Sequence, residues 1–210
     1  MPWPQGSPGI RDQASLRFLT PTPRPRRAWI AALGALVLVS ACAPRPQPSL
    51  IGGAFRLVDQ NGAAVDQTIL EGKWSAVFFG YTFCPDVCPT TLTTLAQAIE
   101  KLGPRARRLQ VLFISIDPGR DTPAQLKSYL SSPAFPKGTI GLTGTPQEIA
   151  RVARAYRVYF KKVGDGPNYS VDHTSIVYLM DPQGRFSEPV DFGGTPDQVA
   201  RQIAKAMNGT

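Results

Sequence analysis

The stretch SAVFFGYTFCPDVCPTTLTTLAQAIEKL, residues 75–102, contains the features that decide the fold. Its first six residues, SAVFFG, form a short apolar run, which predicts a buried β-strand. From residue 90 to residue 102 the apolar residues recur at helical spacing, which predicts an amphipathic helix. The segment CPDVCP, residues 84–89, therefore lies between a buried strand and the beginning of a helix.

Further strands are predicted on both sides of this unit. Residues 109–116, LQVLFISI, form a second buried run, and shorter runs follow near Ile140, at 159–163 and at 175–179. Upstream, FRLVD (55–59) followed by Asn61-Gly62 predicts a β-hairpin with a two-residue turn. The sequence DPQG, residues 181–184, predicts a second hairpin, which adds an antiparallel edge.

Three helix starts share one pattern, a threonine followed by proline with Gln or Glu at the third helical position. They are TPAQ at 122–125, TPQE at 145–148 and TPDQ at 195–198. The threonine side-chain oxygen accepts a hydrogen bond from a free N–H of the first helical turn. The Gln or Glu side chain accepts a second one from the backbone N–H of the threonine. Helices are therefore predicted over 123–131, 146–156 and 196–207.

Strands that alternate with helices indicate a parallel sheet covered on both faces. The predicted fold is α/β and thioredoxin-like, with a central, mostly parallel sheet flanked by helices and an extra N-terminal β-hairpin. It occupies residues 54–210.

The residues before this domain are typical of a targeting leader. Residues 29–41, WIAALGALVLVSA, have no charge, follow an arginine-rich segment and end in small residues before Cys42. This resembles a bacterial lipobox, so we expect a signal or lipoprotein leader over 1–41, lipidation of Cys42 and a Pro-rich linker over 42–53. An uncleaved signal anchor is the alternative. Either arrangement predicts a bacterial, membrane-anchored protein whose domain faces the periplasm, an oxidising compartment.

The net charge is +8, and half of it lies in residues 1–41, which contain five arginines and one aspartate. The remaining basic excess is not clustered with aromatic residues, so nucleic-acid binding is not predicted.

Cys84 and Cys88 are the chemically distinctive residues. A helix N-terminus lowers the pKa of a nearby thiol, and spacing i, i+4 can bring two sulfur atoms to one side. Such a pair can bind a soft metal ion or close into a structural disulfide, which is frequent in exported proteins. The single histidine, His173, is predicted before the 175–179 strand, where it is a plausible third ligand. Two thiolates with one imidazole favour copper, as Cu(I) or Cu(II).

Three segments resemble the signature segments of the Sco/SenC family: GYTFCPDVCPTTL, SIDPGRDTPAQL and VDHTSIVYLMDPQG. The resemblance covers residues 54–207 and implies a copper-binding thioredoxin-like protein that assists assembly of the binuclear copper centre of cytochrome c oxidase. It implies Cys84, Cys88 and His173 as copper ligands, with Asp86 and Asp172 as acidic neighbours. It also implies, as partners, the copper-bearing oxidase subunit and other periplasmic copper chaperones.

Three functions remain open on the sequence. A metallochaperone would use all three ligands, whereas a thiol–disulfide reductase would use Cys84 and Cys88 as a redox pair to keep the oxidase cysteines reduced. A peroxiredoxin-like peroxidase is disfavoured because the PxxxT/SxxC arrangement is missing. The SIDPGRDTP loop, with Asp117, Arg120 and Asp121, is interpreted as structural, with a local ion pair.

Overall fold

The structure is a computed structural model that describes residues 50–190 and 193–209. The leader expected over 1–41, the lipidation site Cys42 and most of the linker lie outside the described residues. In the described ranges, no helix is both long enough and apolar enough to cross a membrane.

Seven strands form the central sheet, in the order β2-β1-β5-β4-β3-β8-β9. They are β1 (Arg56–Asp59), β2 (Ala64–Asp66), β3 (Trp74–Gly80), β4 (Leu109–Ser115), β5 (Ile140–Thr143), β8 (Val177–Met180) and β9 (Phe186–Val190). Strands β3, β4 and β5 pair in parallel at the centre, whereas the hairpins β1–β2 and β8–β9 and their junctions with the centre are antiparallel. The predicted α/β class, with both hairpins, is confirmed.

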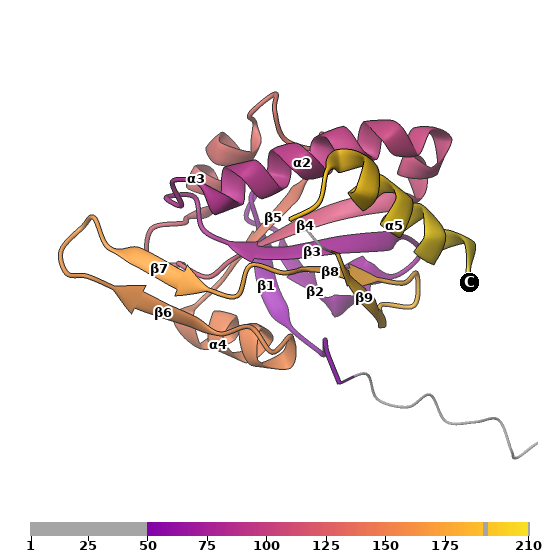
Figure 1. The fold of residues 1–210 in the computed structure, drawn as a ribbon. Helices are drawn as coiled ribbons and strands as arrows, with labels where there is room; N and C mark the ends of the chain where they lie inside the picture. The colour runs from indigo at the N-terminus through magenta and orange to yellow at the C-terminus, as the bar shows by residue number, and fades with distance from the viewer. Residues whose placement is uncertain (1–49, 191–192, 210) are drawn as a thin grey trace, which may run out of the picture. The chain divides into compact units, whose positions relative to one another are not determined.

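Helices cover both faces of this sheet. They are α2 (Val87–Leu102), α3 (Pro123–Leu130), α4 (Pro146–Ala155) and α5 (Pro196–Asn208), with short 3-10 helices η1 (Gln67–Leu70) and η2 (Gly103–Arg108). Helices α2, α3 and α5 lie on one face and α4 lies on the other (Figure 1).

Strand β3 supplies both halves of the core, because successive side chains of a strand point to opposite faces. Trp74, Ala76 and Phe78 pack on the α2 and α5 side, while Val77 and Phe79 pack on the α4 side. All seven residues of β3 are buried, which explains its unbroken apolar sequence.

The predicted helix starts are confirmed at Pro123, Pro146 and Pro196. Thr145 and Thr195 form complete capping boxes with Glu148 and Gln198. At Thr122 the prediction of a hydrogen bond from the threonine N–H to the Gln125 side chain is wrong. The Gln125 side chain donates to Thr82 Oγ1 instead, at 3.2 Å, because Thr82 lies within its reach.

Two local predictions near the turns also differ from the structure. The β1–β2 turn has three residues, because the Asp59 N–H donates to the Ala63 carbonyl and Gly62 adopts a positive φ of 83°. Helix α2 begins at Val87, three residues before the predicted start, so Cys88 belongs to the helix.

A second sheet was not predicted. Strands β6 (Phe160–Val163) and β7 (Ser170–His173) pair antiparallel as a separate two-stranded sheet. Strand β7 has one buried residue, Val171, so its apolar signal is too short to recognise. The predicted strand at 175–179 begins at Val177, and His173 therefore ends β7 rather than immediately preceding β8.

Candidate metal centre

The two cysteines lie on either side of the first residue of α2. Cys84 is in the loop after β3 and is half-buried, whereas Cys88 is in the first turn of the helix and is fully buried. Both are free thiols. The Cys88 N–H donates to Cys84 Sγ at 3.4 Å, so an otherwise unpaired N–H at the helix start faces the sulfur.

Gly80, the last residue of β3, allows Cys88 to pack against the end of the strand. A Cβ atom at this position would lie 2.8 Å from Cys88 Sγ and 2.9 Å from the ring of Phe113. Real Cβ atoms do not approach other atoms so closely. A residue without a side chain is therefore required here for close packing of the strand, the helix and the buried sulfur.

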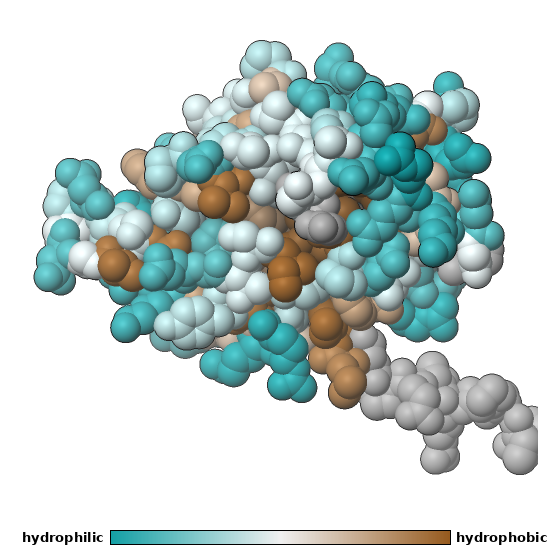
Figure 2. Space-filling view, viewed as in Figure 1, coloured by the Kyte–Doolittle hydropathy of each residue, from teal (hydrophilic) through white to brown (hydrophobic). Residues whose placement is uncertain are grey.

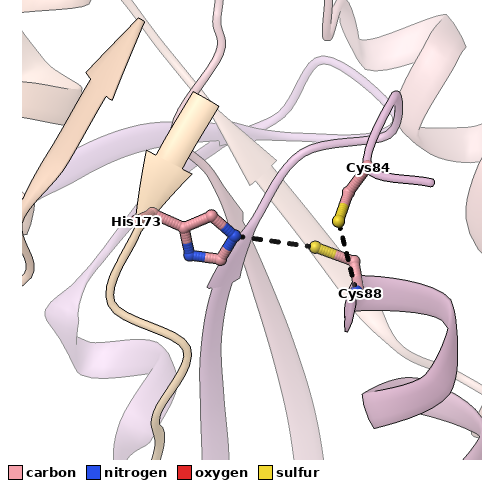
Figure 3. A group of neighbouring side chains, drawn as sticks. All are labelled: Cys84, Cys88 and His173. Atoms are coloured by element: carbon pink, nitrogen blue, oxygen red, sulfur yellow. Dashed lines mark hydrogen bonds between the residues drawn. The ribbon is translucent and has the colours of Figure 1, made fainter. Parts of the chain in front are cut away.

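His173 completes the group from a different part of the chain. Its Nδ1 lies 3.1 Å from the Thr174 carbonyl oxygen, and its Nε2 lies 3.9 Å from Cys88 Sγ. Figure 3 shows the imidazole ring pointing toward that sulfur. Because a carbonyl oxygen only accepts, Nδ1 carries the ring proton when this bond is made. Neutral Nε2 then presents its lone pair toward the sulfur atoms, which is the arrangement that metal-binding histidines use.

The donor atoms of Cys84, Cys88 and His173 all lie within 4.8 Å of one another. Metal bonds to sulfur and nitrogen are about 2.0–2.3 Å long, so at tetrahedral or trigonal angles two ligands of one ion lie about 3.5–4.0 Å apart. A contraction of the cluster by up to about 1 Å would therefore let the three atoms share one ion. Two sulfurs and one imidazole form a soft set that suits copper.

The two thiols are electrostatically unequal. Hydrogen bonding from the Cys88 thiol lowers the pKa of Cys84 to about 3 despite partial burial, with smaller contributions from His173 and nearby backbone N–H groups. The same hydrogen bond, then burial and the negative charge on Cys84, raise the pKa of Cys88. These shifts favour the half-buried Cys84 as the thiolate and the fully buried Cys88 as the thiol.

Asp86 and Asp172 lie near the centre but outside the donor cluster. Both are exposed and line the same surface depression as Cys84 and His173. Asp86 precedes α2 and accepts a hydrogen bond from Thr90 Oγ1 at 3.3 Å. Their carboxylates thus contribute negative charge to the opening rather than ligand atoms.

The loop after β4 contacts the cysteine loop, which the sequence did not indicate. The local ion pair expected in this loop forms between Asp117 and Arg120, and both side chains are largely buried. Asp121 is fully buried and accepts hydrogen bonds from Ser115 Oγ at 2.7 Å and from Thr82 Oγ1 at 2.7 Å. Burial raises the pKa of Asp121, while these bonds oppose the shift. The network fixes the start of the loop that contains Cys84, because Thr82 is bonded to Asp121.

Exposed apolar side chains lie within three residues of the proposed ligands in the sequence. Phe83, Val87 and Ile176 are at least one-third exposed. In Figure 2 the hydrophobic surface is divided into small areas separated by hydrophilic residues. Val87 lines the same surface depression as Cys84 and His173, so the opening offers an apolar contact beside the sulfur and nitrogen donors.

Comparisons with known proteins agree with this geometry. The SCO1/SenC family profile matches residues 43–208. The SCO2-like protein of Rickettsia felis is 40% identical over 152 residues, which cover 71% of this chain and 73% of the relative. Protein SenC of Rhodobacter capsulatus is 42% identical over 157 residues, covering 73% and 69% respectively.

Solved structures give the same assignment. The structure of Bradyrhizobium japonicum ScoI with copper bound is 47% identical, with a TM-score of 0.68, and the match covers 74% of this chain and 99% of that one. The family profile spans most of the chain, and its relatives share the fold that carries the Cys84, Cys88 and His173 cluster. The chain belongs to the SCO1/SenC family.

Proposed function

We propose that this protein is a copper metallochaperone that binds Cu(I) or Cu(II) through Cys84, Cys88 and His173. The observation that carries the proposal is the convergence of two sulfur atoms and one imidazole nitrogen within 4.8 Å from two separate segments of the chain. The copper-bound relative of the same fold supports copper over other soft metals.

Its role would be to assist assembly of the binuclear copper centre of cytochrome c oxidase, with which the SCO1/SenC family is associated. The copper-bearing oxidase subunit is the proposed recipient, and other periplasmic copper chaperones are the proposed donors. The sequence pattern of residues 29–42 supports membrane anchoring through Cys42 or an uncleaved helix, with the domain in the periplasm. No nucleic-acid role is proposed.

The inequality of the two thiols favours a second candidate, a thiol–disulfide reductase. The Cys84 thiolate, the less buried of the two, would attack a partner disulfide, forming a mixed disulfide and releasing one partner thiolate. Cys88, after losing its proton, would attack Cys84 Sγ and release the second partner thiolate. The partner disulfide gains two electrons, and Cys84 and Cys88 become a disulfide.

A copper titration of reduced residues 43–210 tests the first proposal, with His173→Ala as a parallel variant. One equivalent of Cu(II) should give intense thiolate-to-copper absorption, and the variant should lose it. Cu(I) binding should survive better in the variant, because two thiolates suffice for Cu(I). If the wild-type protein binds neither ion while both thiols are titratable, the chaperone proposal fails and the reductase remains.

A further inference from the structure

His173 lies at the end of β7, a strand that is not part of the central sheet. Strands β6 and β7 pair only with each other, and Figure 1 shows them projecting from the side of the sheet. The cysteines, in contrast, lie at the junction of β3 and α2 within the main core. Side-chain contacts must therefore set the distance between the imidazole and the sulfur atoms.

Arg120 makes several of these contacts to the hairpin. Its Nη1 donates to the carbonyl oxygens of Pro167 and Tyr169, at 3.2 and 3.0 Å. Its guanidinium carbon lies 3.6 Å from the centroid of the Tyr169 ring. Tyr169 is four residues before His173 and directly precedes β7.

The same guanidinium also reaches the cysteine loop. It lies 4.6 Å from the centroid of the Phe83 ring, and Phe83 directly precedes Cys84. Arg120 thus contacts both segments that carry metal ligands, but it is not part of the donor cluster.

Asp117 fixes the orientation of the guanidinium. It pairs with Arg120 Nε, and its other carboxylate oxygen accepts from the Tyr169 hydroxyl at 2.6 Å. Asp117 is 6% exposed and Arg120 15% exposed, so the pair is shielded from water. A planar, five-donor guanidinium can make the ion pair, the two carbonyl bonds and the ring contact together, which an ammonium cannot do.

We infer that Arg120 is a positioning residue for the metal centre, because it clamps the His173 hairpin against the Cys84 loop. The inference rests on the proposed copper function and adds a residue to it. A weakened clamp should increase the freedom of His173 while leaving the two thiolates in place.

Arg120→Lys tests this inference in residues 43–210, since Pro48–Thr210 forms one compact unit with its own core. Arg185→Lys is a matched control, because Arg185 pairs with the mostly buried Asp181 at the β8–β9 turn. Tyr169→Leu removes the ring contact from the hairpin side without altering a buried charge, and so provides a second variant if Arg120→Lys folds poorly.

Two measurements are made on each protein. The first is the affinity for Cu(II) and Cu(I), with the nitrogen coupling in the Cu(II) electron paramagnetic resonance spectrum. The second is amide hydrogen exchange of peptides from residues 159–174 in the metal-free protein.

Arg120→Lys and Tyr169→Leu should weaken Cu(II) binding about 10- to 100-fold, the usual effect of losing support around a ligand, and reduce the nitrogen coupling. Cu(I) affinity should change less, and exchange in 159–174 should accelerate while β3 and β4 are unchanged. Arg185→Lys should match the wild-type protein in these readouts.

The inference is overturned if Arg120→Lys behaves like Arg185→Lys in copper binding and exchange. Equal weakening of Cu(I) and Cu(II) also overturns it, because Arg120 would then act on the cysteines rather than through His173. Absence of copper binding by the wild-type protein is a different result, and would reject the proposed function itself.

Discussion

Replacement of Gly80 by alanine tests the packing that places the buried sulfur. The new methyl group would lie 2.8 Å from Cys88 Sγ and 2.9 Å from Phe113 Cε2. Both neighbouring side chains have no exposed surface, so neither can move into solvent. Gly80 is paired with Ser115 of β4, and its carbonyl accepts from the Ile116 N–H at 2.9 Å, so its backbone cannot easily shift away.

Overpacking of this kind costs about 1–3 kcal/mol. With a urea m-value of about 2 kcal/mol/M, the unfolding midpoint should fall by about 0.5–1.5 M. The same clash would displace Cys88 Sγ, one of the proposed copper ligands. Copper affinity should therefore decrease together with stability.

Urea unfolding and copper titration of reduced residues 43–210 measure the two effects. Gly53→Ala is the control, because its new Cβ would meet the Ala155 Cβ at 3.4 Å, an ordinary contact. That variant should retain wild-type stability and copper affinity. If Gly80→Ala also retains both, Cys88 and Phe113 have room to adjust, and the packing argument is wrong.

Further predictions concern the thiols and a distant helix cap. Cys84→Ser or Cys88→Ser should each abolish Cu(I) binding and disulfide exchange, measured by titration and by reduction of a model disulfide; retention of tight Cu(I) binding by either variant would contradict the shared site. Because the pKa of Cys84 is lowered to about 3, its rate of alkylation in the folded protein should be nearly constant between about pH 5 and 8, whereas thiols of the urea-unfolded chain should react faster as pH rises. The pKa of Cys84 is lower in the folded protein than in the unfolded chain. The Cys84 thiolate therefore contributes its full stabilisation at pH values above the unfolded-state pKa, and this contribution is lost as pH falls toward 3. Thr145→Ala should cost about 1 kcal/mol in urea unfolding by removing the α4 cap, but should leave copper affinity unchanged.

Several parts of the fold could be predicted because local chemistry determines them. The unbroken apolar runs of β3 and β4 reflect burial on both faces of a parallel centre. The Thr-Pro pairs mark three helix starts because a threonine oxygen and a proline ring suit the first helical turn.

The rest of the site depends on contacts between distant residues. Strand β7 was missed because a four-residue strand with one buried side chain has almost no periodic signal. The role of Arg120 was missed for another reason. Its partners Pro167 and Tyr169 lie 47 and 49 residues away, so the sequence indicated only a local ion pair within the loop.

The placement of the three donors has a consequence for copper transfer. Cys88 is fully buried, whereas Cys84 and His173 are half-buried and line the surface depression. An incoming ligand would therefore approach copper from the side of Cys84 and His173. His173 can move away with the β6–β7 hairpin without breaking a hydrogen bond of the central sheet, because the two sheets are separate. On the proposed function, the imidazole is then the donor that leaves first, while two thiolates retain Cu(I) until the recipient's ligands replace them.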